Sequence, residues 1–131
     1  MFRILGLDHV VLRVADMARA RAFYCDVLGC TVARERGDLG LTQLRAGAAL
    51  IDLVDLSSTL GRKLGAGPAA RPEAGGRNMD HLCLRIEPFD AAAIAAHLRA
   101  HGVTPGEVAP RFGADGTGPS MYIADPDGNT V

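Results

Sequence analysis

Two stretches of eight residues decide how this chain folds: LDHVVLRV at positions 7–14 and MDHLCLRI at positions 79–86. The second follows the first by 72 residues, and Asp, His, Leu and Arg occupy the same places in both. Most of the remaining positions are apolar in both copies, which predicts a strand in each. Similarity that returns at a fixed separation indicates an internal duplication, so we expect two halves with one architecture.

Each stretch is followed by an amphipathic helical pattern. The first pattern begins at Asp16, a suitable N-cap, and stops at Gly29, a suitable residue just after a helix. The second begins at Asp90 and stops at Gly102. The apolar stripes are Met17, Ala20, Phe23, Tyr24, Val27 and Leu28 in the first pattern, and Ala91, Ile94, Ala95 and Leu98 in the second. Each half therefore opens with a strand, a helix and a glycine.

The rest of each half is predicted to form strands. They fall near 31–36, 41–45 and 48–55 in the first half, and near 104–110, 120–124 and from 129 onward in the second. The unit β-α-β-β-β thus occurs twice, which predicts an α+β fold. We expect a single domain over residues 1–131, with module one at 1–56, a flexible Gly-, Ala- and Pro-rich linker at 57–77, and module two at 78–131.

The composition excludes several classes of function. Hydrophobic residues make up 48% of the 131 residues, and the formal net charge of −1 lacks the basic excess of a nucleic-acid binder. No apolar run approaches the roughly 18 residues of a membrane span. Three cysteines without a Cys-x-x-Cys motif favour a reducing compartment. We therefore expect a cytoplasmic protein that binds a small molecule or a protein partner, with no nucleic-acid or membrane partner.

Successive side chains of a β-strand point to opposite faces of the sheet. The residues of the first predicted strand of each half can therefore be assigned to two faces. Val10, Leu12 and Val14 share the face suited to packing on the helix, while His9, Val11 and Arg13 share the other. In the second copy Leu82, Leu84 and Ile86 correspond to the helix face, and His81, Cys83 and Arg85 to the opposite one. If the two sheets curve toward each other, the repeated histidines face a shared cavity.

Two imidazoles across a cavity suit a divalent metal if a carboxylate joins them. Asp52 is the candidate, because it lies among apolar residues in LIDLVD at positions 50–55. A structural reading stands beside this one. A strand histidine can simply be hydrogen-bonded within the fold, and an acid on an edge strand can serve to prevent aggregation of sheets.

Four motifs resemble those of the vicinal oxygen chelate superfamily, which includes glyoxalase I, extradiol dioxygenases, fosfomycin-resistance enzymes and bleomycin-binding proteins. They are the LDHV opening, AFYCDVLG at 22–29, the second Asp-His at 80–81, and YIADPDGN at 122–129. The resemblance covers essentially the whole chain. It implies paired β-α-β-β-β modules that form curved mixed sheets around a cavity, a divalent ion (Ni, Zn, Mn or Fe), and a homodimer whose modules pair within or between chains.

By this resemblance His9 and His81 match metal ligands. Asp52 matches a ligand position that is usually Glu, Gln or His, and its side chain is one methylene shorter than Glu. The last ligand of the family is a Glu at the position after Val131. Either this protein lacks that ligand or the natural chain continues, and we expect that it continues. Tyr122 matches a substrate-contacting tyrosine and is the candidate catalytic residue. The alternative is that Tyr122 is an aromatic residue that only packs in its strand.

The resemblance leaves three functions open. The first is a glyoxalase-like lyase or isomerase that chelates neighbouring oxygens of an anionic substrate, with Arg13 and Arg85 as substrate-binding residues. The second is an extradiol-type dioxygenase, disfavoured because Phe112 and Gly113 occupy the region where that group carries a further His. The third is a binding protein for a small molecule such as an antibiotic, in which both strand histidines are structural.

Two further features are ambiguous in the sequence. Gly113, Gly116 and Gly118 predict a Gly-rich loop, either an ordinary connection or one that closes over a ligand. His97 and His101 lie four positions apart on the second predicted helix. They could bind a metal at the surface, or His101 could interact with the negative end of the helix dipole.

Overall fold

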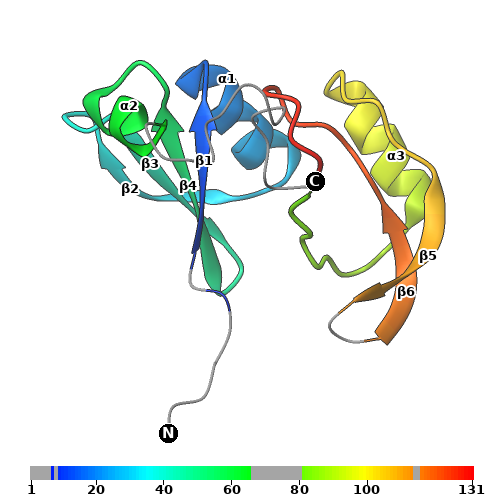
Figure 1. Cartoon of the computed structure of the whole chain (residues 1–131). Helices are drawn as coiled ribbons and strands as arrows, with labels where there is room; N and C mark the ends of the chain where they lie inside the picture. The colour runs from blue at the N-terminus through cyan, green and yellow to red at the C-terminus, as the bar shows by residue number, and fades with distance from the viewer. Residues whose placement is uncertain (1–6, 8, 66–80, 114–115) are drawn as a thin grey trace, which may run out of the picture. The chain divides into compact units, whose positions relative to one another are not determined.

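The structure, a computed structural model, describes residues 7, 9–65, 81–113 and 116–131. The chain divides into two compact units, Met1–Asn78 and Met79–Val131. The fold is α+β with an open, curved mixed sheet, as the sequence predicts (Figure 1). Within the described ranges no helix is both long and apolar enough to cross a membrane.

The first unit is built around a four-stranded sheet in the order β1-β4-β3-β2 (Figure 1). Its elements are β1 (His9–Val14), α1 (Met17–Ala22), the π-helical η1 (Phe23–Val27), β2 (Thr31–Arg36), β3 (Leu41–Ala46), β4 (Ala49–Asp55) and α2 (Thr59–Gly65). Strand β1 runs parallel to β4, whereas β3 is antiparallel to both β4 and β2. The sheet is therefore mixed, and its three expected strands after the helix lie within one residue of their predicted bounds.

The first helical segment begins and ends where the sequence predicts. The Asp16 side chain accepts a hydrogen bond from the backbone N of Arg19 at 3.0 Å, which satisfies a donor that the helix leaves free. The chain continues from α1 into η1 and leaves the helical conformation at Gly29, whose φ of 78° is disfavoured for other residues. The segment thereby delivers Phe23 and Tyr24, both buried, to the core.

The core of the first unit lies on one face of its sheet. Leu12, Val14, Leu44, Ile51 and Leu53 are all buried there. The register aligns these positions across the sheet, because Leu12 pairs with Leu53 and Leu44 with Ile51. The face that we predicted to pack on the helix is therefore the core face. His9, Val11 and Arg13 are exposed and lie on the opposite face.

The second unit repeats the pairing pattern of the first in a shorter form. It contains α3 (Ala91–Ala100), β5 (Val108–Gly113) and β6 (Gly116–Met121), with β5 antiparallel to β6. His81 forms an isolated parallel bridge with Thr130, which in turn bridges Ala124 in the antiparallel sense. This order of parallel and antiparallel neighbours matches that of β1, β4 and β3, so the duplication extends to the topology.

The expected linker is partly helical. We predicted a flexible segment at 57–77, but α2 occupies Thr59–Gly65. Ser58 explains the difference, because its Oγ accepts a hydrogen bond from the backbone N of Gly61 at 2.9 Å and so caps the helix. The remaining part of the expected linker, from residue 66 on, lies outside the described residues.

The strands of the second half also differ from their predicted bounds. Residues 82–86 follow the His81 bridge without forming a strand, and Ile86 is 51% exposed instead of covering the helix. Strand β5 begins at Val108 and not at 104, and β6 covers Gly116–Met121 and not 120–124. The predicted Gly-rich loop is therefore mostly a β-hairpin. Backbone pairing across the hairpin, such as Arg111 with Gly118, outweighs the low strand propensity of glycine.

Candidate functional site

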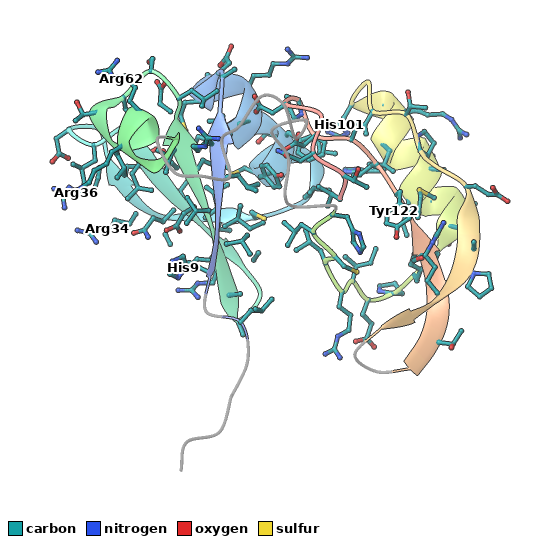
Figure 2. All side chains as sticks on the ribbon, viewed as in Figure 1. His9, Arg34, Arg36, Arg62, His101 and Tyr122 are labelled. Carbon is teal, nitrogen blue, oxygen red and sulfur yellow. The ribbon has the colours of Figure 1, made fainter. Side chains whose placement is uncertain are left out.

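The face of the first sheet opposite the core carries three of the six predicted site residues. His9 pairs with Leu50 and Val11 with Asp52, and paired residues of neighbouring strands point to the same side. His9 and Asp52 therefore share this face, and Arg13, two residues further along β1, shares it as well. Figure 2 labels His9 at the start of β1.

Asp52 is held in a constrained position on that face. It is only 6% exposed, although it carries a carboxylate. Its Oδ2 accepts a hydrogen bond of 2.9 Å from Nε2 of Gln43, the residue directly opposite it on β3. Its Oδ1 is buried and has no hydrogen-bond partner among the described residues. One carboxylate oxygen is thus fixed by the neighbouring strand and the other is left to accept a donor or a cation.

These features suit a metal ligand. A buried polar atom without a partner costs about 1–3 kcal/mol, and more when the group is charged. A second contact to an outer residue, here Gln43, is the usual means by which proteins orient a metal-binding carboxylate. The described parts of the chain contain no group of three His, Cys, Asp or Glu side chains placed to hold an ion. Within the first unit, the residues suited to a metal are His9 and Asp52.

The second unit gathers a separate aromatic cluster around its repeated histidine. The ring centroids of His81 and Tyr122 are 5.4 Å apart, with an edge-to-face angle of 64°. The guanidinium carbon of Arg111 lies 4.3 Å from the centroid of the Tyr122 ring, a cation–π contact. Tyr122 is 37% exposed, so its ring is held by two neighbours while part of it stays accessible (Figure 2).

Backbone and side-chain contacts fix the residues of this cluster. Nη1 of Arg111 donates to Oγ of Ser120 at 2.8 Å, which anchors the cation above the ring. The backbone N of Gly106 donates to the Tyr122 carbonyl at 3.0 Å. A Cβ on Gly106 would lie 2.3 Å from that oxygen, so only glycine allows this close approach. The sequence predicted Tyr122 as a site residue, but it did not indicate these partners.

The pairing of the second unit locates a further position of interest. Asp52 lies two residues after Leu50, the partner of His9. By the same register, the position two residues after Thr130, the partner of His81, is the one that follows Val131. Thr130 pairs with Ala124 in the antiparallel sense, so the position two residues after Thr130 would lie opposite Tyr122. In the first unit, Asp52 lies opposite Gln43 in the same way. By this register, a residue at that position would be the counterpart of Asp52.

The two predicted substrate-binding arginines are both exposed. Arg13 extends from β1 on the face of His9 and Asp52, whereas Arg85 lies in the irregular segment after His81. The structure brings Arg13 onto the face of the candidate ligands by strand register alone. Gln43 and Arg111 are the contact residues that sequence reasoning missed. Their roles depend on cross-strand partners that are not adjacent in sequence.

Comparison with known proteins identifies the class. The Glyoxalase/Bleomycin resistance protein/Dioxygenase superfamily is matched by residues 6–131, nearly the whole sequence. The chain therefore belongs to this superfamily, the vicinal oxygen chelate group that its motifs resemble.

The chain is also similar to individual proteins and solved structures. Uncharacterized protein YaeR of Escherichia coli (strain K12) is 32% identical over 112 residues, which are 79% of this chain and 76% of that protein. Virulence protein STM3117 from Salmonella typhimurium superposes with a TM-score of 0.75 and 28% identity, over 98% of this chain and 94% of that chain. A mutant of the fosfomycin resistance protein FosX from Listeria monocytogenes has a TM-score of 0.67 and 20% identity, over 98% and 87% of the two chains. That structure is a complex with Mn(II) and 1S,2S-dihydroxypropylphosphonic acid.

Proposed function

We propose that this protein is a divalent-metal-dependent enzyme of the lyase or isomerase type, acting on a small anionic substrate with two neighbouring oxygens. The observation that carries the proposal is the buried Asp52, whose Oδ1 has no hydrogen-bond partner in the described parts of the chain. It shares a sheet face with His9, and together they offer the imidazole and carboxylate groups that such ions prefer.

The proposed ligands come from both halves of the duplication. His9 and Asp52 belong to the first unit, and His81 occupies the corresponding histidine position of the second. A carboxylate at the position after Val131 would complete the set, because the register makes that position the counterpart of Asp52. The FosX complex with Mn(II) supports a divalent ion in proteins of this fold. Ni, Zn, Mn and Fe are the candidates for this chain.

The chemistry divides between the ion and the side chains of this chain. When bound, the ion would act as a Lewis acid on the two substrate oxygens. The Tyr122 hydroxyl donates a hydrogen bond to an oxygen that gains negative charge during the reaction. Arg111 above the Tyr122 ring keeps the ring oriented, since it is itself fixed by Ser120. Arg13 and Arg85 bind the anionic group of the substrate through charge-assisted hydrogen bonds.

We also propose that the protein forms a homodimer, as two-module members of this group usually do. Light scattering should give a mass of about twice the 13.7 kDa of one chain. A mass near that of one chain would contradict the dimer and would leave the metal proposal to be tested in the monomer.

The deciding experiment is metal analysis by mass spectrometry. The protein should be prepared without an affinity tag, from a chain that continues past Val131. We expect about one divalent ion per chain at this site after reconstitution. The ion should be lost in His9→Ala, in His81→Ala and in Asp52→Asn, which removes the charge while keeping the shape.

A matched control uses histidines outside the proposed site. His97 and His101 on α3 account for the other two of the four histidines, so their replacement by Gln should leave this ion bound. Retention of the ion in His9→Ala and His81→Ala would overturn the ligand assignment. If the parent protein takes up no ion at this site, the enzyme proposal fails. The proposal that the protein is a non-catalytic binding protein then takes its place. Bound iron together with oxygen uptake would instead establish the dioxygenase.

A further inference from the structure

The C-terminal end of α3 carries two histidines that the proposed function does not use. His97 lies in the last turn of the helix and His101 is its C-cap residue. Residues four apart lie on the same side of a helix, one turn above the other. Both side chains are exposed, and their ring centroids are 4.4 Å apart with an angle of 45° between the planes. Figure 2 labels His101 at the yellow end of α3.

The hydrogen bond of His101 determines which of its ring nitrogens can bind a ligand. Its Nδ1 lies 2.9 Å from the carbonyl oxygen of His97. A carbonyl oxygen can only accept, so Nδ1 must carry the proton and donate. In the neutral ring the lone pair then resides on Nε2. This is the arrangement that metal-binding histidines adopt, with one nitrogen donating to a backbone carbonyl and the other facing the ion.

The spacing of the two rings fits a shared ion. Imidazole nitrogens bind first-row divalent ions at about 2.0–2.1 Å, so two nitrogens on one ion lie within roughly 4 Å of each other. The ring centroids of His97 and His101 are 4.4 Å apart, a separation comparable with that distance. The end of α3 also presents carbonyl groups, and the negative end of the helix dipole favours a cation there.

We propose that His97 and His101 form a second, surface binding site for a divalent transition-metal ion. The ion is one that accepts imidazole ligands, with affinity in the order Cu²⁺ above Ni²⁺ and Zn²⁺. The site is independent of the proposed active site, because it uses neither His9, Asp52 nor His81. The sequence also predicted an interaction of His101 with the negative end of the helix dipole, and the hydrogen bond to the His97 carbonyl is such an interaction. This bond leaves Nε2 of His101 available, so it supports ion binding and does not compete with it.

Copper titration of a chain with His9→Asn and His81→Asn tests this site. Of the four histidines of the sequence, that variant keeps His97 and His101. We expect it to bind one Cu²⁺ per chain, with an electron paramagnetic resonance spectrum that shows coordination by two imidazole nitrogens. Adding His97→Gln or His101→Gln should weaken Cu²⁺ binding by roughly tenfold or more, at least as much as loss of an outer partner of a ligand does.

Arg99→Gln is the matched control, because it changes another exposed side chain in the last turn of the same helix. It should leave the affinity for Cu²⁺ unchanged or slightly raise it through loss of a positive charge. Unchanged Cu²⁺ affinity in both histidine variants, or spectra without two imidazole nitrogens, would overturn the proposal.

A second measurement avoids variants altogether. In the unaltered protein, small amounts of Ni²⁺ should broaden the ring resonances of His97 and His101 together. If neither ring resonance broadens, an ion site at this end of α3 is contradicted. The two sites have separate ligands. Failure of the active-site proposal would therefore not change the outcomes expected for His97 and His101, and failure of the His97–His101 site would not change those expected for the active site.

Discussion

Nε2 of Gln43 donates a hydrogen bond of 2.9 Å to Oδ2 of Asp52, linking two residues that face each other across β3 and β4. Asp52 is 6% exposed, so this bond is the described contact that compensates for the burial of its carboxylate. The pair thus combines the energetic cost of a buried carboxylate with an oxygen that can bind an ion. The same geometry leaves Oδ1 without a hydrogen-bond partner among the residues that the structure describes, so this oxygen is available to a cation.

Removal of this donor should destabilise the metal-free protein. Gln43→Leu would leave both oxygens of Asp52 buried without a hydrogen bond, and we expect the free energy of unfolding to fall by about 1–3 kcal/mol. Urea denaturation of the metal-free variant measures this. Asp52→Leu supplies the matched background, because Gln43→Leu should have a much smaller effect once the carboxylate is gone. Effects that add to within about 0.5 kcal/mol would show that the two residues are not coupled.

The start of α2 should be sensitive to acid. Hydrogen bonds from the Ser57 hydroxyl and backbone N, both 2.7 Å from Oδ1, lower the pKa of Asp55 below its usual value of 3.8. A carboxyl whose pKa is lowered by folding stabilises the protein above its unfolded pKa, and this contribution disappears as the pH falls through the folded pKa. Asp55→Ala should therefore be less stable than the parent at pH 7. The difference should shrink as the pH falls below 3.8.

Thermal unfolding followed by circular dichroism across this pH range provides the measurement. Asp55→Asn separates the contribution of the carboxylate charge from that of the hydrogen bond. It removes the charge but keeps an oxygen that can accept a hydrogen bond from Ser57. A difference between Asp55→Ala and the parent that stays constant down to pH 2 would contradict the assignment.

The contact between Gly106 and Tyr122 should not tolerate a methyl group. In Gly106→Ala the new Cβ would meet the Tyr122 carbonyl at 2.3 Å, so the backbone beside the candidate catalytic tyrosine must shift. We expect a loss of about 1–3 kcal/mol in stability, as for other overpacked sites. The His81 ring resonances should also change, because that ring lies 5.4 Å from the Tyr122 ring. Gly37→Ala is the control, since nothing lies within 4 Å of its Cβ, and it should leave the His81 resonances in place.

The three cysteines should react with alkylating agents at different rates. Burial raises the pKa of the Cys30 thiol and also that of Cys25, which reduces the fraction present as the reactive thiolate at neutral pH. Cys83 is exposed and accessible to reagent. In the folded protein at pH 7, peptide mass spectrometry should find Cys83 alkylated first and Cys30 last. In urea the three rates should converge, and equal rates in the folded protein would contradict the burial of Cys30.

The sequence alone predicted much of the first unit and less of the second. The strands β2, β3 and β4 lie within one residue of the predicted ranges, because turns at Gly37 and Gly47 separate clear strand patterns. In the second half the glycines near residues 113–118 indicated a loop, yet they form a hairpin. Strand pairing is a non-local interaction, and it can override weak local propensities.

Part of the candidate site followed from sequence periodicity. The alternation of side chains along a strand is a local property, so it correctly placed His9 and Arg13 on the face opposite the core. The combination of His9 and Asp52 with His81 in one metal site stays a prediction. The metal, the dimer and the substrate likewise stay predictions.

The sequence by itself determined the duplication, the order of elements in the first half, the helix caps at Asp16 and Asp90, and membership of the superfamily. These features are encoded by neighbours within a few residues or by motifs that recur along the chain. The tertiary structure decided that Asp52 is buried with a hydrogen bond from Gln43 and that Tyr122 contacts both His81 and Arg111. Such contacts depend on strand register, which is set by the packing of the whole sheet and brings together residues that no local pattern connects.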